Sequence, residues 1–247
     1  MSNLQSSQMS IVVPDAEFKN VTDVAGMKII PVSAHQGVVR LSIEQKSDAK
    51  QRPASVIYTL DKSGSMAGAA MRNAVIGIIA AINKNLDNVE KMFLIVYDVN
   101  ATIIQVTKNN QKETIQMLER LSAGNRTSFT NMFIAIEKIA TENFMEDFVI
   151  YIFTDGEHMP GYDDSVMYQS TQQSLKILLK NRPGKSCVKT RAFSNGVDVP
   201  VMSNLTTFGM EAGDFQYANS AAEITSMLEN DEFLHVKTIT GTLHIGD

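Results

Sequence analysis

Runs of apolar residues alternate with amphipathic stretches through the middle of this chain. The segments 55–60 (SVIYTL), 92–97 (MFLIVY) and 148–153 (FVIYIF) are almost entirely apolar, which is typical of strands buried on both faces of a parallel sheet. Between them, apolar residues recur every three or four positions, as in the segment 69–86, which predicts amphipathic helices. This alternation predicts an α/β fold with a doubly wound, mostly parallel sheet and helices on both faces.

The same pattern predicts the other elements of this domain. An edge strand is expected at 101–107, beside the core strand 92–97. Further strands are expected at 186–193 and 214–217. The remaining helices are expected at 111–121, 131–143, 165–180, 201–208 and 221–229.

The two ends of the chain have a different pattern, in which single apolar and polar residues alternate without long apolar runs. We expect residues 1–26 to form a disordered or extended segment. Residues 27–52 and 233–247 are expected to pair into a small β-rich appendage, because both alternate in this way and neither is long enough to be stable alone. Residues 53–232 then form the main domain.

Composition and charge exclude several classes of protein. The chain is 44% hydrophobic and 20% charged, as is usual for a globular protein, and its net charge of −5 disfavours nucleic acid as a partner. No apolar run approaches the roughly 18–20 residues that cross a membrane, and the N-terminal residues do not resemble a signal peptide. A cytoplasmic location is therefore expected. The single cysteine, Cys187, excludes an internal disulfide.

Oxygen-bearing side chains follow two of the core strands directly. Asp61, Ser63 and Ser65 come after the first strand, and alternate residues of an extended segment point to the same side. Asp155 follows the strand 148–153. Because parallel strands present their carboxyl ends at one edge of the sheet, we expect these side chains to converge there.

A threonine from the loop before the helix 131–143 completes the set, and two candidates, Thr127 and Thr130, are present. Two carboxylates and three hydroxyls suit a hard cation such as Mg²⁺, with Mn²⁺ or Ca²⁺ as alternatives. Taken singly, each motif also fits an ordinary turn, and Ser65 also fits an N-cap of the helix 69–86. Their joint occurrence at strand ends favours a metal site.

The motifs together resemble those of von Willebrand factor A domains. The segment 59–66 (TLDKSGSM) resembles the Asp-x-Ser-Gly-Ser-Met sequence that opens the metal-ion-dependent adhesion site of that family. The segment 152–157 (IFTDGE) resembles the family's strand that ends in Thr-Asp-Gly, and 191–198 (RAFSNGVD) is similar to a later strand and loop. The likeness extends over residues 55–229.

This resemblance implies a role and a ligand set. A domain of this family binds protein partners, and a Glu or Asp of the partner commonly completes the coordination of its metal ion. The resemblance assigns Ser63, Ser65 and Thr127 as direct ligands, with Asp61 and Asp155 acting directly or through water. An acidic residue of a protein partner is therefore expected at the ion.

The threonine loop departs from the family's usual sequence. Members often carry Gly-Gly-Thr, whereas this loop reads Gly124-Asn-Arg-Thr127. Thr127 has the usual spacing from Leu121, but Thr130-Asn131 matches the Thr-Asn pattern that opens the next helix in integrin-type domains. We prefer Thr127 and keep Thr130 as the alternative.

Enzymes of several classes fit the sequence less well. A haloacid-dehalogenase-like phosphatase requires a second acid where this chain has Ser63, and the residues around Ser65 do not form the Gly-x-Ser-x-Gly motif of serine hydrolases. A Mg²⁺-dependent hydrolase or phosphatase stays an alternative, as does a structural domain with a vestigial metal site. The sequence indicates neither the identity of the partner nor the oligomeric state.

Overall fold

A computed structural model describes residues 8–12, 27–31, 38–43, 54–155, 165–193, 197–218 and 220–230. The chain divides into two compact units, Met1–Lys50 and Gln51–Asp247. Each unit is described by itself.

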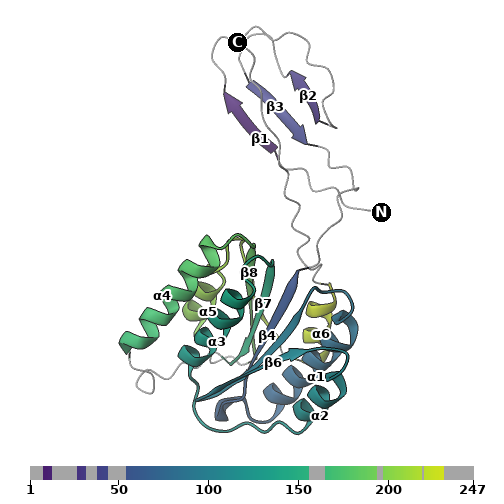
Figure 1. Ribbon diagram of the computed structural model, residues 1–247, viewed down its shortest axis with the longest axis vertical. Helices are drawn as coiled ribbons and strands as arrows, with labels where there is room; N and C mark the ends of the chain where they lie inside the picture. Colours follow the sequence, from purple (N-terminus) through teal and green to yellow (C-terminus); the bar gives the residue numbers. More distant parts are fainter. Residues whose placement is uncertain are drawn as a thin grey trace. The chain divides into compact units, whose positions relative to one another are not determined.

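The first unit contains a three-stranded antiparallel sheet (Figure 1). Its strands are β1 (Gln8–Val12), β2 (Met27–Pro31) and β3 (Val38–Ile43), with β3 in the centre. The sequence pattern predicted β2 and β3 but not β1, which falls in the segment expected to be extended or disordered. Five residues with only alternate apolar positions are too short a signal to predict a strand. The expected pairing with 233–247 lies outside the described residues and stays a prediction.

The second unit is built on a six-stranded sheet with the strand order β6-β5-β4-β7-β8-β9. Adjacent strands are parallel except for β5 and β6, which are antiparallel, so the mostly parallel sheet and its edge strand are confirmed. The strands are β4 (Ser55–Asp61), β5 (Met92–Tyr97), β6 (Ala101–Val106), β7 (Phe148–Thr154), β8 (Ser186–Ala192) and β9 (Phe215–Tyr217).

Helices cover both faces of this sheet, as expected. Figure 1 shows α1, α2 and α6 on one side and α3, α4 and α5 on the other. Every predicted helix is present, with ends that differ by a few residues from those expected. The helices are α1 (Ala69–Asn85), α2 (Gln111–Glu119), α3 (Phe129–Glu142), α4 (Ser165–Asn181), α5 (Val199–Leu205) and α6 (Ala221–Asn230).

The sheet separates two apolar cores. Every residue of β4, β5 and β7 is buried, which explains their uninterrupted apolar sequences. Along β4, Tyr58 packs with the side chains of α1 and α6, whereas Ile57 packs with those of α3 and α4. Because helices cover both faces of the sheet, its strands reach the surface through the loops at their ends, and those at the carboxyl ends carry the polar residues predicted from the sequence.

Candidate metal centre

Asp61 is the last residue of β4 and is completely buried. Its Oδ1 accepts a hydrogen bond of 2.8 Å from the backbone N–H of Ser63. Its Oδ2 accepts one of 2.7 Å from the hydroxyl of Thr154, the last residue of the neighbouring strand β7. The carboxylate is therefore held in one orientation at the carboxyl edge of the sheet.

Burial makes the ionised form of Asp61 unfavourable. Its pKa is raised from 3.8 to about 6, mainly by removal from solvent and to a smaller extent by the charge of Asp155, while the hydrogen bonds from Ser63 and Thr154 oppose the rise without cancelling it. A cation beside the carboxylate would remove this cost by stabilising the charged form. The local electrostatics therefore suit a positive ion.

The two serine hydroxyls meet beside this carboxylate. The Oγ atoms of Ser63 and Ser65 lie 3.1 Å apart, so both oxygens can contact one ligand. They are brought together by η1 (Gly64–Met66), a turn of 3-10 helix, and not by the extended chain that we expected. The turn shortens the distance between alternate residues because each step along a 3-10 helix is only about 2 Å.

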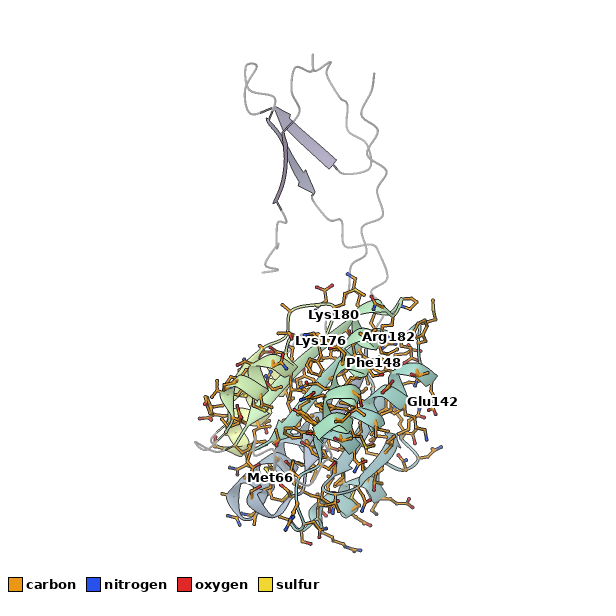
Figure 2. All side chains as sticks on the ribbon, turned by 90° about the vertical axis from the view of Figure 1, so that its left-hand side faces the viewer. Met66, Glu142, Phe148, Lys176, Lys180 and Arg182 are labelled. Atoms are coloured by element: carbon orange, nitrogen blue, oxygen red, sulfur yellow. The ribbon has the colours of Figure 1, made fainter. Side chains whose placement is uncertain are left out.

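Ser65 does not cap the helix that follows. The N-cap of α1 is Gly68, which has no side chain to accept a hydrogen bond. Figure 2 shows Met66, the last residue of η1, at the opposite end of the domain from Phe148, the first residue of β7. The turn thus lies at the carboxyl end of the parallel strands. Since Gly68 is the N-cap of α1, the capping interpretation of Ser65 is wrong.

The loop 124–127 lies directly against the loop 61–65 at the end of β4. The N–H of Gly64 donates to the carbonyl of Asn125 at 2.9 Å, and the N–H of Gly124 donates to the carbonyl of Lys62 at 2.8 Å. A Cβ atom at position 64 would meet the Asn125 carbonyl at 3.3 Å, a tight contact that glycine avoids. This close approach gives glycine a role between the two serines.

Both candidate threonines are buried, but they occupy different positions. Thr127 lies in the loop before α3, two residues after Asn125, whereas Thr130 lies within the first turn of α3. The hydrogen bond from Gly64 to Asn125 attaches the segment that contains Thr127 to the serine turn. The preference for Thr127 over Thr130 stays a prediction.

Asp155 follows β7 immediately and is 3% exposed. Its charge acts on Asp61, raising that group's pKa, so the two acids predicted to share a site are electrostatically coupled. The residues after it, 156–164, lie outside the described residues. Asp61, at the end of β4, and Asp155, after β7, therefore contribute one carboxylate each to the same edge of the sheet.

Two further residues of this edge were not predicted to have a role. Thr154, which belongs to the Thr-Asp-Gly motif, orients Asp61, and Asp98, which directly follows β5, contacts the side chains of Lys62 and Asn125. The only sequence signal of Asp98 is that it lies at the carboxyl end of a core strand. Within the described part of the chain, no three His, Cys, Asp or Glu side chains gather into a group that could hold a metal ion. The candidate ligands predicted from the sequence are three hydroxyls and the carboxylates of Asp61 and Asp155, which would fit Mg²⁺ better than a softer metal.

No protein-family model and no curated protein matches the sequence. Solved structures do match the fold. One is a von Willebrand factor type A protein from Catenulispora acidiphila, with a TM-score of 0.61 and 12% identity over 77% of this chain. The match covers 43% of that protein, so this chain spans less than half of its length.

Two further structures match over most of their own length. The von Willebrand factor domain of the type V pili tip protein Mfa5 from Porphyromonas gingivalis has a TM-score of 0.56 and 13% identity, over 78% of this chain and 99% of that one. The manganese-loaded TRAP protein of Plasmodium vivax has a TM-score of 0.51 and 13% identity, over 72% of each chain. At these identities the likeness concerns the fold.

Proposed function

We propose that this chain, whose second unit has the von Willebrand factor A fold, is a protein-interaction module that works through a bound metal ion. The ion is Mg²⁺, with Mn²⁺ or Ca²⁺ as alternatives. It holds an acidic residue of a protein partner. The proposed ligands are Asp61, Ser63, Ser65, Thr127 and Asp155.

The observation that carries this proposal is the geometry of the loop 61–65. Two serine hydroxyls lie 3.1 Å apart beside Asp61, a fully buried carboxylate whose pKa is raised to about 6. Asp155 adds a second carboxylate to this edge. Asp61, Ser63 and Asp155 are buried and Ser65 is exposed, so two acids and two hydroxyls lie at an edge that solvent can reach, which suits a hard cation.

The residues divide into two roles. The hydroxyls of Ser63, Ser65 and Thr127 would contact the ion directly. Each oxygen of Asp61 already accepts one hydrogen bond, which favours a role through bound water for this carboxylate. The bound ion supplies a strong electrostatic attraction for a carboxylate from outside, because two acids at most neutralise its charge.

The known neighbours agree with a binding role. The manganese-loaded state of one neighbour supports a divalent ion at this fold, and another neighbour is a pilus tip protein. Neither name is that of an enzyme, and we place the hydrolase or phosphatase alternative second. No helix in the described segments is both long and apolar enough to cross a membrane.

The proposal is tested by capture of partners with the full chain in Mg²⁺ and in EDTA. A partner should be retained by wild type in Mg²⁺ and released by EDTA, and the double variant Ser63→Ala, Ser65→Ala should not retain it. Ser170→Ala, which removes an exposed hydroxyl of α4, is the matched control and should behave as wild type. Substituting acidic residues of the partner then locates the carboxylate. Equal capture in EDTA would show that binding uses another surface.

A further inference from the structure

Asp98 is a buried carboxylate that lies outside the proposed ligand set. It directly follows β5 and is 2% exposed. Its Oδ1 accepts a hydrogen bond of 2.9 Å from the N–H of Asn100. Its Oδ2 accepts one of 2.8 Å from the side-chain amide of Asn125 and also pairs with the ammonium group of Lys62.

The two side-chain partners of Asp98 come from the two loops that the metal centre requires. Lys62 lies between Asp61 and Ser63, and Asn125 lies two residues before Thr127. One carboxylate oxygen thus connects both loops.

Backbone hydrogen bonds reinforce the connection. The carbonyl of Asp98 accepts from the N–H of Ser128 at 2.9 Å, immediately after the threonine. The carbonyl of Tyr97 accepts from the N–H of Lys62 at 2.8 Å. The end of β5 is therefore attached to both loops through main-chain and side-chain atoms.

The backbone of Asn125 adopts an uncommon conformation that its contacts stabilise. Its φ of 63° lies in the left-handed region, which asparagine tolerates better than most residues other than glycine. In this conformation its carbonyl accepts from Gly64 while its side chain donates to Asp98. The contact to Asp98 thus holds the backbone turn that places Asn125 against the serine turn.

Asp98 is suited to this role because it is charged. Burial alone would raise its pKa, but the hydrogen bonds from Lys62, Asn125 and Asn100 outweigh burial and lower the pKa below the usual 3.8. An ionised acceptor makes shorter and stronger hydrogen bonds than a neutral one.

We propose that Asp98 is a positioning residue, whose carboxylate clamps the loop 124–127 against the loop 61–65 so that the hydroxyls of both loops face one ion. The ion in this statement rests on the proposed function. The clamp itself rests on the contacts of Asp98 with Lys62 and Asn125.

The test compares Asp98→Ala, Asn125→Gly and the double variant of the full chain. Asn125→Gly keeps the left-handed backbone accessible and removes the side-chain contact to Asp98. The matched control is Asp87→Ala, which removes an exposed aspartate that pairs with Lys108. Two quantities are measured for each protein: Mg²⁺ affinity by calorimetry, and amide exchange of Gly64 and Gly124, whose N–H groups bridge the loops.

We expect each single variant to weaken Mg²⁺ binding by about tenfold, the lower end of the effects of residues that orient metal ligands. The double variant should bind Mg²⁺ no more weakly than Asp98→Ala, because Asp98→Ala already removes the contact that Asn125→Gly removes. The amides of Gly64 and Gly124 should exchange about tenfold faster, whereas that of Ile150 in the core of β7 should not change. Asp87→Ala should match wild type in both measurements.

Several outcomes would overturn the clamp. Unchanged exchange in Asp98→Ala and Asn125→Gly would show that the loops are held without it. Faster exchange with unchanged Mg²⁺ affinity would show that it does not position ligands, and additive effects would show that the two residues act separately. If wild type binds no Mg²⁺, the proposed function fails, and the exchange of Gly64 and Gly124 decides the clamp alone. If Asp98→Ala does not fold, Asn125→Gly provides the same two measurements.

Discussion

The hydroxyl of Thr154 donates a 2.7 Å hydrogen bond to Oδ2 of Asp61, from the end of one core strand to the end of its neighbour. Both residues are fully buried. Thr154 immediately precedes Asp155, so the bond also connects the strands that present the two acids of the candidate centre. The orientation of Asp61 is consequently set before any ion binds.

Thr154→Val should weaken metal binding by loosening this carboxylate. Valine keeps the shape of threonine but leaves Asp61 without a donor that lowers its pKa, so we expect that pKa to rise further above about 6. Mg²⁺ affinity near neutral pH should fall by up to about tenfold, since a loss of roughly 1 kcal/mol per hydrogen bond has this order of effect. Thr154→Ser keeps the hydroxyl and should bind Mg²⁺ as wild type does. Equal affinities for all three proteins would show that the bond has no part in binding.

Asp61→Asn should change the pH dependence of stability without metal. The pKa of Asp61 is about 6 in the folded protein and has its usual value of 3.8 in the unfolded chain, so between these pH values the folded wild type holds a proton that the unfolded chain has lost. Its free energy of unfolding in EDTA should therefore decrease as pH rises through this window, by roughly 1 to 3 kcal/mol, relative to the variant. Denaturant unfolding at several pH values measures this difference.

The same variant separates the cost of the buried charge from its benefit. Near neutral pH, Asp61→Asn should be at least as stable as wild type in EDTA. Mg²⁺ should then stabilise wild type and leave the variant nearly unchanged, because binding to the folded state shifts the unfolding equilibrium by mass action. If the variant is less stable than wild type in EDTA, the charge of Asp61 does not destabilise the metal-free fold.

Much of the fold could be predicted because β4, β5 and β7 are buried on both faces and their sequences are correspondingly apolar. The positions of Asp61 and Asp155 followed from the ends of those strands. The strand β1 could not be predicted, since five residues of mixed polarity do not differ from a loop.

The finer geometry of the site depends on contacts between segments that are distant in sequence. The 3-10 turn at Gly64–Met66 and the left-handed Asn125 support each other through one hydrogen bond, and neither has a local sequence signal strong enough to predict it. Asp98 was missed for the same reason, because its partners come from two other loops. Individual acids and hydroxyls could be recognised, whereas the contacts that hold them required the structure.

The choice between the two threonines can be tested with shape-preserving variants. Thr127→Val removes the hydroxyl that we assign to the ion, so Mg²⁺ affinity should fall by at least about tenfold, the smallest typical effect of losing a residue that only orients a ligand. Thr130→Val removes a hydroxyl in the first turn of α3 and should change that affinity by less than about twofold. Calorimetry of both variants measures the difference. The reverse order would assign the site to Thr130 and keep the other four ligands.

The central claim is that one divalent ion binds between the loop 61–65, the loop 124–127 and Asp155. Crystals grown in millimolar Mn²⁺ test it most directly, because this ion gives an anomalous signal. We expect a single strong peak, with the hydroxyl oxygens of Ser63, Ser65 and Thr127 at about 2.0–2.3 Å and the carboxylates of Asp61 and Asp155 in contact directly or through water. A peak at any other place, or no peak between these side chains at saturating Mn²⁺, would contradict the account.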